Sequence, residues 1–316
     1  MTAPALPAEL AAQQEPAPRR RRRSSHKTRS ALLLLTPFSL LFLGVMIAPI
    51  VYALVQSLFR VQRSGLGLGG GETLFVGIEN YITALQNKDF IASFGRVFGI
   101  GIVQVPLMLL IALVLALLLD AAFAPLRRTF RLIFFLPYAF PAVIAAIMWS
   151  FLYQPRIGPF SDWLAAIGLD VNFLSGDMAF FSIGNMMIWG YTGFNMLIIY
   201  SALQAVPEEL SEAASLDGAG WWQTAWNIKI PAVRPAIILS AVFSIIGTIQ
   251  LYNDPAILSK VAPGISSTFT PIMAAQQSAA ANNYNLAAAQ SIILALVAFV
   301  LSFGFLKFTQ RKGAES

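Results

Sequence analysis

The sequence has 316 residues, of which 57% are hydrophobic and only 11% are charged, and its mean hydropathy is +0.68. Because a soluble domain carries about 25% charged residues, this composition excludes a chain that faces water on all sides. With no cysteine, disulfides, thiolate metal sites and cysteine nucleophiles are excluded, and the only histidine, His26, lies in a basic tail. The net charge of +6 does not indicate a nucleic-acid partner, because seven basic residues crowd just before the first apolar stretch, where membrane proteins place cytoplasmic charge.

The first 30 residues are expected to form a disordered, basic cytoplasmic tail. Residues 1–18 are rich in alanine, proline and glutamine, a composition that buries too little apolar surface to fold. A basic cluster around Arg19–Arg23 then precedes the apolar stretch Ala31–Leu54. A secretory signal peptide has the same order, but this stretch is too long and no small-residue cleavage site ends it. We therefore predict a retained first span.

Six stretches reach the roughly 20 apolar residues that a helix needs to cross about 30 Å of hydrocarbon. They are Ala31–Leu54, Val97–Leu119, Leu132–Leu152, Phe180–Ala202, Ala236–Leu258 and Leu286–Phe308. Several contain proline or glycine, which membrane helices tolerate where neighbouring groups satisfy the freed backbone. The sequence thus predicts an all-α membrane protein with six transmembrane helices over residues 31–308, followed by a cytoplasmic C-terminal tail at residues 309–316.

Basic residues indicate how these spans are oriented. Six spans place both termini on one side, and that side carries fifteen lysine and arginine residues against six on the other. Because cytoplasmic loops carry the excess of basic residues, we predict a multi-pass protein of the inner (cytoplasmic) membrane with both termini cytoplasmic. The glycine-rich run Gly65–Gly71 then faces outward, and we interpret it as a flexible loop, since it lacks the Lys-Ser/Thr of a phosphate-binding loop.

The cytoplasmic loop at residues 207–231 has the pattern of two short helices. Pro207 suits a first helical position, and the acidic pair that follows favours the positive end of a helix dipole. Gly218 is a natural left-handed cap, and Pro231 is expected to end the second helix. Between Leu210 and Asp217, small residues at helical spacing form a face that another protein could approach closely. Because loops of this length are uncommon without a function, we expect it to have one.

Three segments of this loop carry a family signature. Glu212-Ala213-Ala214, Asp217-Gly218-Ala219 and Ile228-x-Ile230-Pro231 resemble the EAA motif of ABC importer permeases, in the form of the maltose-type, binding-protein-dependent carbohydrate-uptake branch. The sequence departs at Ile230, where leucine is usual, and at Trp226, where phenylalanine is frequent. Outside the loop, Gly77-Ile-Glu-Asn-Tyr81 is also similar to these permeases.

The resemblance implies a type I ABC importer permease architecture, in which this loop is the coupling helix that docks on the ATPase. The residues carried over to that role are Glu212, Ala213, Ala214, Asp217, Gly218 and Pro231. Implied partners are a second homologous permease in a heterodimer, a dimer of ATP-binding subunits, an extracytoplasmic solute-binding protein and a sugar-like substrate. The chain has no Gly-x-x-x-x-Gly-Lys-Ser/Thr, so we predict no enzymatic activity and no cofactor, with ATP and Mg bound by the partner.

Polar residues near the middle of spans four and five are candidate solute contacts, because a bilayer penalises polar groups that serve no purpose. The candidates are Tyr191, Thr192, Phe194, Asn195, Gly247, Thr248, Gln250 and Asn253. Hydroxyls and amides suit a polyol, and aromatic faces suit a sugar ring. Matching maltose-type permeases by position also implies Tyr191, Phe194, Gly247 and Gln250. Helix packing through small and polar residues is the alternative interpretation of this set.

An ion-coupled secondary transporter is the alternative function. Such proteins need ionisable groups within their spans, whereas Asp120 and Asp254 lie toward helix ends here. A channel has no charged ring or filter-like repeat to support it, and a membrane enzyme has no nucleophile or carboxylate pair. The sequence therefore favours a permease subunit of an ATP-driven importer of a sugar or oligosaccharide.

Overall fold

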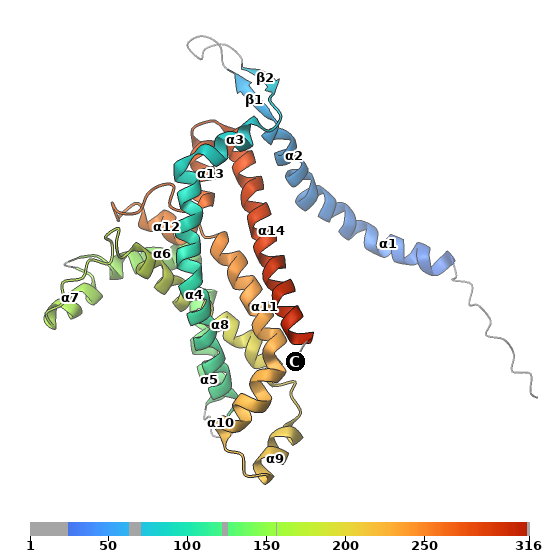
Figure 1. The fold of residues 1–316 in the computed structure, drawn as a ribbon, viewed down its shortest axis with the longest axis vertical. Coiled ribbons are helices and arrows are strands. Elements are labelled where there is room, and N and C mark those ends of the chain that lie inside the picture. Colours follow the sequence, from blue (N-terminus) through green and yellow to red (C-terminus); the bar gives the residue numbers. More distant parts are fainter. Residues whose placement is uncertain (1–24, 63–70, 122–125, 156, 315–316) are drawn as a thin grey trace, which may run out of the picture. The chain divides into compact units, whose positions relative to one another are not determined.

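The structure is a computed structural model in which four stretches of the chain are described. They are residues 25–62, 71–121, 126–155 and 157–314 (Figure 1). Residues 1–24 of the predicted disordered tail and most of the run Gly65–Gly71 lie outside the described residues, whereas residues 25–30 of that tail are helical.

The chain divides into two units, Met1–Tyr52 and Ala53–Ser316. The first unit contains α1 (Ser25–Phe42), the π-helical turn η2 (Leu43–Ile47) and the start of α2 (Ala48–Ser57). The helix begins ahead of the predicted start at Ala31, and from Leu32 to Ser57 it is apolar enough to cross a membrane. This helix corresponds to the predicted first span.

The second unit holds the remaining elements, most of them helical. In chain order they are β1 (Phe59–Gln62), β2 (Glu72–Phe75), α3 (Glu79–Gln86), α4 (Lys88–Asp120), α5 (Arg127–Ala139), α6 (Ala142–Leu152), α7 (Pro159–Ala166), α8 (Ala179–Leu203), α9 (Glu208–Leu216), α10 (Trp221–Thr224), the π-helical turn η3 (Ala225–Lys229), α11 (Ile230–Ile249), α12 (Asn253–Leu258), α13 (Pro271–Ala280) and α14 (Tyr284–Ala314). The described residues contain five helices able to span a membrane, or six if α5 and α6 form one span. The predicted six spans are reached when α5 and α6 count as one.

A two-stranded antiparallel sheet departs from the predicted all-α fold. β1 pairs with β2 so that Phe59 faces Phe75 and Gln62 faces Glu72. The two phenylalanine rings meet edge-on with centroids 5.4 Å apart, a cross-strand contact that stabilises a hairpin. The hairpin is a small addition to a mostly helical fold, and a search for long apolar stretches overlooks its two four-residue strands.

The Gly77–Tyr81 segment holds this hairpin to the helices that flank it. The Asn80 side chain is buried and donates to the carbonyl oxygens of Ser57 (2.8 Å) and Phe59 (2.7 Å). The hydroxyls of Tyr81 and Ser57 lie 2.6 Å apart. Because buried backbone carbonyls need a donor, Asn80 stabilises the turn from α2 into β1.

Two of the predicted spans are broken. α5 and α6 meet at an angle of 93°, with Phe140 extended and Pro141 in the N-cap position just before α6. A proline disfavours helical backbone at the preceding residue, so the sharp turn follows from Pro141. The fifth span breaks after α11, and a short segment at residues 250–252 leads into α12. Leu132–Leu152 and Ala236–Leu258 are therefore not the continuous helices that hydropathy predicts.

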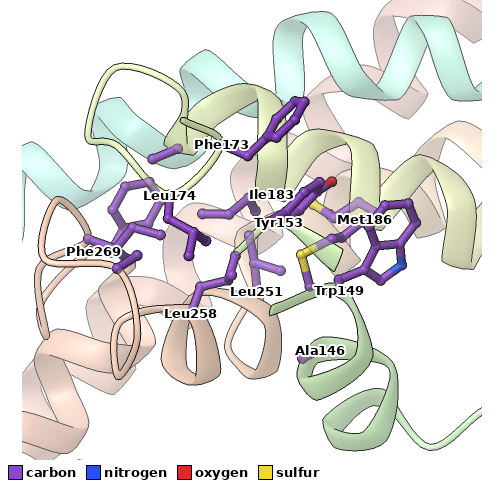
Figure 2. Packing of buried hydrophobic residues seen from close by; sticks show 14 of the residues in the cluster. Ala146, Trp149, Tyr153, Phe173, Leu174, Ile183, Met186, Leu251, Leu258 and Phe269 are labelled. Atoms are coloured by element: carbon purple, nitrogen blue, oxygen red, sulfur yellow. The ribbon is translucent and has the colours of Figure 1, made fainter. Parts of the chain in front are cut away.

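A buried apolar cluster joins α6, α8 and α12 to the loop that precedes α8 (Figure 2). Tyr153 is among its most buried side chains and stacks on Phe173 with ring centroids 5.1 Å apart. Burial raises the pKa of the Tyr153 phenol to about 12, and the opposing hydrogen bond from Asn185 (2.8 Å) does not prevent this. The phenol therefore stays neutral. The cluster fixes the broken ends of α6 and α12 against α8.

Gly193 lets α5 pack directly against α8. A Cβ atom at this position would lie 1.9 Å from the carbonyl oxygen of Phe134, which is backbone and cannot move aside. At Gly190, one turn earlier on the same helix, a Cβ atom would meet nothing within 4 Å. The close approach of the two helices therefore requires glycine at 193 but not at 190.

We expect Gly193→Ala to destabilise the protein, because overpacking against rigid backbone costs about 1–3 kcal/mol or more. Gly190→Ala is the matched control and should leave stability nearly unchanged. Thermal unfolding of the detergent-solubilised protein, followed by size-exclusion chromatography, measures the difference. Equal melting temperatures for the two variants would contradict this helix contact.

Candidate functional site

A cavity of about 260 Å³ lies where α4, α5, α8 and α11 meet, and we call it the central cavity. Its lining residues are Gln104, Met108, Tyr138, Met187, Tyr191, Phe194, Asn195, Phe243, Ser244, Gly247 and Thr248. None of them carries a charge. The cavity combines amides and hydroxyls with aromatic rings and methionines, a surface suited to an uncharged polar molecule with apolar faces.

The polar side chains of the central cavity contact one another across helices. The Thr248 hydroxyl lies 3.3 Å from Oε1 of Gln104 and 2.8 Å from the carbonyl oxygen of Ser244. The Ser244 hydroxyl lies 3.4 Å from Oδ1 of Asn195, whose amide nitrogen donates to the Tyr191 carbonyl at 3.0 Å. Buried polar groups that orient one another in this way hold fixed donor and acceptor positions.

Aromatic rings form one wall of the cavity. Tyr138 stacks on Phe194 with ring centroids 4.7 Å apart and planes 18° apart, and it meets Tyr191 edge-on at 5.9 Å. Tyr138 and Tyr191 are about two-fifths exposed, so their rings are open to a ligand. Stacked and edge-on faces of this kind match the apolar side of a sugar ring.

The structure brings together five of the eight residues predicted as solute contacts: Tyr191, Phe194, Asn195, Gly247 and Thr248. Thr192 does not line the cavity, because its buried hydroxyl donates to the Ile188 carbonyl.

The other two predicted contacts lie past the end of α11. Gln250 is an exposed residue that follows the last turn of this helix, and Asn253 begins α12 and lines a different cavity of about 390 Å³. The break in the fifth span, which hydropathy does not predict, separates both from the central cavity.

Sequence reasoning missed the contribution of α4 to the cavity. Gln104 is 3% exposed within the otherwise apolar stretch Val97–Leu119, and its amide nitrogen lies 3.3 Å from the sulfur of Met108. An amide in the middle of a span is a recognisable signal, because a buried polar group there is costly without a partner. The isolated glutamine of the second span therefore pointed to the same site.

A larger groove of about 730 Å³ runs between α4, α11 and α14. Its walls are almost entirely aliphatic and aromatic, with Arg234 and Thr309 among the few polar residues. It offers little hydrogen bonding to a polar solute, so the smaller central cavity is the better candidate.

The loop predicted to bind a partner contains α9, which projects from the second unit (Figure 1). α9 has no buried residue, and Leu210 and Leu216 are 49% and 89% exposed. Glu212 and Ala213 are exposed as well. Gly218 has φ of +82°, the left-handed conformation predicted for the cap after α9. Exposed leucines on a helix at a sharply defined turn indicate a docking surface.

Pro231 does not end a helix, contrary to the prediction. The helix that begins at Trp221 passes through η3 into α11, and Pro231 lies in the first turn of α11. A proline cannot donate a backbone hydrogen bond. The π-helical turn just before it changes the hydrogen-bond spacing, so that the helix continues past Pro231. The loop is therefore joined rigidly to the fifth span.

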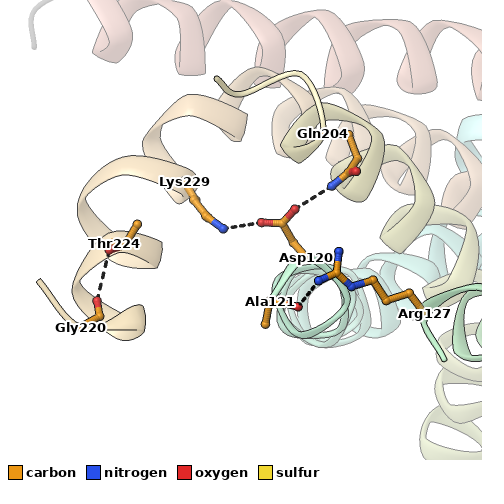
Figure 3. A network of polar contacts seen from close by, with 7 residues as sticks. All are labelled: Asp120, Ala121, Arg127, Gln204, Gly220, Thr224 and Lys229. Atoms are coloured by element: carbon orange, nitrogen blue, oxygen red, sulfur yellow. Dashed lines mark hydrogen bonds and ion pairs between the residues drawn. The ribbon is translucent and has the colours of Figure 1, made fainter. Parts of the chain in front are cut away.

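Polar contacts anchor η3 to the ends of α4 and α8 (Figure 3). The Lys229 ammonium and the Asp120 carboxylate form an ion pair at 2.5 Å, with side chains 16% and 10% exposed. Gln204 donates to the other carboxylate oxygen of Asp120 at 2.7 Å, and Arg127 donates to the Ala121 carbonyl at 2.7 Å. Nothing in the sequence indicated that Asp120 and Lys229 are partners.

Among the described residues, no group of three or more His, Cys, Asp or Glu side chains is placed to hold a metal ion.

Apolar spans around a polar cavity, joined to an exposed helical loop, define a membrane transport protein. The family model described as "Binding-protein-dependent transport system inner membrane component" matches residues 112–312. The chain belongs to this family. It is a multi-pass inner-membrane permease subunit of a binding-protein-dependent ABC importer, without catalytic activity of its own. Membership removes the ion-coupled secondary transporter as an alternative.

Individual relatives support the predicted family. The chain is 30% identical to the trehalose/maltose transport system permease protein of Thermococcus litoralis, over 68% of this chain and 71% of that protein. It is 26% identical to the sulfoquinovosyl glycerol transport system permease protein of Agrobacterium fabrum, over 89% and 91%. It is 28% identical to an sn-glycerol-3-phosphate transport system permease protein of Yersinia enterocolitica, over 75% and 81%.

A solved structure supports the predicted fold. A chain of a bacterial alginate ABC transporter, in complex with an alginate pentasaccharide-bound periplasmic protein, superimposes with a TM-score of 0.75 at 21% identity. The superposition covers 92% of this chain and 98% of that chain. The predicted importer-permease architecture is confirmed.

We expect Asp120→Ala and Lys229→Ala to destabilise the protein, because each removes one partner of a mostly buried ion pair, a loss that costs up to about 3–5 kcal/mol. The double variant should lose less than the sum of the two, since the charges are removed together. Thermal unfolding of the purified protein measures all three. The exposed ion pair of Arg60 and Glu79, at 2.9 Å, is the matched control, and its removal should cost at most about 1 kcal/mol.

Proposed function

We propose that this chain forms part of the translocation pathway of an importer for a neutral sugar or oligosaccharide. The observation that carries the proposal is the uncharged lining of the central cavity, with its amides, hydroxyls and exposed rings. Relatives named for trehalose and maltose carry neutral sugars, and others are named for sn-glycerol-3-phosphate or for alginate, an acidic polysaccharide. An anionic solute calls for a basic group, and none lines the central cavity.

The size of the cavity supports a heterodimer with a second, homologous permease. A volume of about 260 Å³ is below the roughly 300–1,000 Å³ of ordinary small-molecule sites. The partner permease would supply the facing wall, so that two chains together enclose the solute. An extracytoplasmic solute-binding protein would deliver the solute to this pair.

The exposed loop supports a coupling role. In this proposal α9, which carries Glu212, Ala213 and Ala214, docks on the ATP-binding subunit, with Asp217 and Gly218 shaping the turn. The excess of basic residues favours a cytoplasmic position for this loop and for both termini. Because the helix from Trp221 continues through Pro231 into α11, a push on α9 would be passed to the fifth span. The Lys229–Asp120 ion pair would pass it to α4.

We expect Gly218→Val to uncouple ATP hydrolysis from solute delivery, because a β-branched residue resists φ of +82° and the turn after α9 changes shape. In the reconstituted transporter, stimulation of ATPase activity by the liganded binding protein should fall, while basal activity and assembly persist. Gly220→Ala is the control, because Gly220 has φ of −72° and open space around its Cβ position. Normal stimulation in Gly218→Val would contradict the coupling role.

We expect Tyr191→Ala and Ser244→Ala to raise the solute concentration needed for half-maximal uptake by several-fold. The first removes a stacking face, and the second a hydroxyl of the kind worth about 0.5–1.5 kcal/mol in a hydrogen bond to a neutral ligand. Uptake into proteoliposomes measures the change, with ATPase stimulation as a check on assembly.

Two variants are controls for this experiment, because neither residue lines the cavity. Thr192→Val removes a hydroxyl that is already bonded within α8, and Gln250→Ala alters the end of α11. Equal uptake kinetics in all four variants would show that the solute passes elsewhere.

A further inference from the structure

A second cavity of about 260 Å³ lies beside the break between α5 and α6, and we call it the acidic chamber. Its lining residues are Pro137, Tyr138, Phe140, Ala142, Ala145, Trp149, Met186, Trp189, Gly190, Tyr191 and Asp254. Trp149 and Met186 also belong to the buried cluster of Figure 2, so one wall of the chamber is rigid core. Asp254 is the charged residue in a lining that otherwise consists of aromatic and uncharged, mostly apolar residues.

Asp254 carries its charge without a partner among the residues that the structure describes. It follows the break in the fifth span and forms no ion pair or side-chain hydrogen bond with any described side chain. The carboxylate is partly buried, so it is screened less than a charge at the protein surface. A partly buried carboxylate in an aromatic cavity attracts hydroxyl donors and cations and repels anions.

The acidic chamber and the central cavity share a wall. Tyr138 and Tyr191 line both, and their rings meet edge-on with centroids 5.9 Å apart. The tyrosine pair therefore belongs to the linings of both cavities. The carboxylate of Asp254 lies on one side of the pair and the uncharged amides of Gln104 and Asn195 lie on the other.

We propose that the acidic chamber is a second solute contact that filters by charge: Asp254 accepts hydrogen bonds from a neutral or cationic, hydroxyl-bearing solute and repels anionic ones. The rings of Trp149 and Trp189, 5.7 Å apart and nearly perpendicular, provide apolar faces for the same molecule. This rests on the proposed function, in which the central cavity belongs to the solute pathway. The filter acts before or after the central cavity, according to the direction of movement.

The chain has no cysteine, so a single introduced thiol reports the charge of the chamber without knowledge of the solute. Gly190→Cys and Ala145→Cys each place a thiol in the lining, and a Cβ atom at Gly190 meets nothing within 4 Å. The assembled transporter in detergent is treated with two methanethiosulfonate reagents, one carrying trimethylammonium and the other sulfonate. The measured quantity is the ratio of their reaction rates.

We expect the cationic reagent to react faster, and Asp254→Asn to lower the cation-to-anion ratio about tenfold, the order expected for one unit charge at close range. Asp254→Glu should keep the ratio and serves as the control for local folding. Asp170→Asn, which neutralises an exposed carboxylate before α8, should leave it unchanged.

An unchanged ratio in Asp254→Asn would overturn the proposal, and so would a failure of both cysteines to react with either reagent. Neither readout depends on transport. A ratio that follows Asp254, together with unaltered uptake in Ser244→Ala, whose residue lines the central cavity and not the acidic chamber, would therefore overturn the central cavity as the pathway and leave the charge selectivity of the acidic chamber established.

Discussion

A helix in hydrocarbon has to satisfy every backbone hydrogen bond within itself, and the two places where this chain breaks that rule organise the rest of the molecule. Pro141 ends the helical backbone at Phe140, and the fifth span is interrupted at residues 250–252. Irregular backbone at membrane depth is tolerated where it is buried in protein or lines a cavity. Phe140 lines the acidic chamber, and Asp254 follows the second break into the same chamber. Both helix breaks therefore supply residues to the lining of the acidic chamber.

Three helical segments connect the central cavity to the polar contacts that Asp120 makes with Lys229 and Gln204. α4 runs without interruption from Gln104 to Asp120, about 24 Å at the rise of an α-helix. In α8, the helix continues from Asn195 to its C-cap, Gln204. The continuous helix formed by η3 and α11 joins Lys229 to Ser244. Rigid elements that share both sites are what a mechanical coupling requires. Breaking the Asp120–Lys229 ion pair would therefore be expected to shift the helices that line the central cavity.

Features that depend on neighbours in sequence were predictable, and features that depend on distant contacts were not. The six spans, the left-handed Gly218 and the exposed loop follow from local patterns of hydropathy, charge and glycine. The partnership of Asp120 with Lys229 joins residues 109 positions apart, and no local pattern encodes it. The prediction that Pro231 ends a helix was wrong for the same reason. The π-helical turn before it packs through Ala225 against residues that are distant in sequence. Gln104 could have been found, since an amide in an apolar span is a local signal.

The placement of charge in this chain suits a pump that takes its energy from outside the membrane. A carrier that couples to protons or sodium ions needs a titratable or coordinating group at the solute site itself. Here the central cavity is lined by amides, hydroxyls and rings, and the carboxylate of Asp254 lies on the far side of the Tyr138–Tyr191 pair. With no charge to neutralise on each cycle, the central cavity would have only to open alternately to either side in the proposed mechanism. The helices that continue from the loop would carry that motion to the cavity.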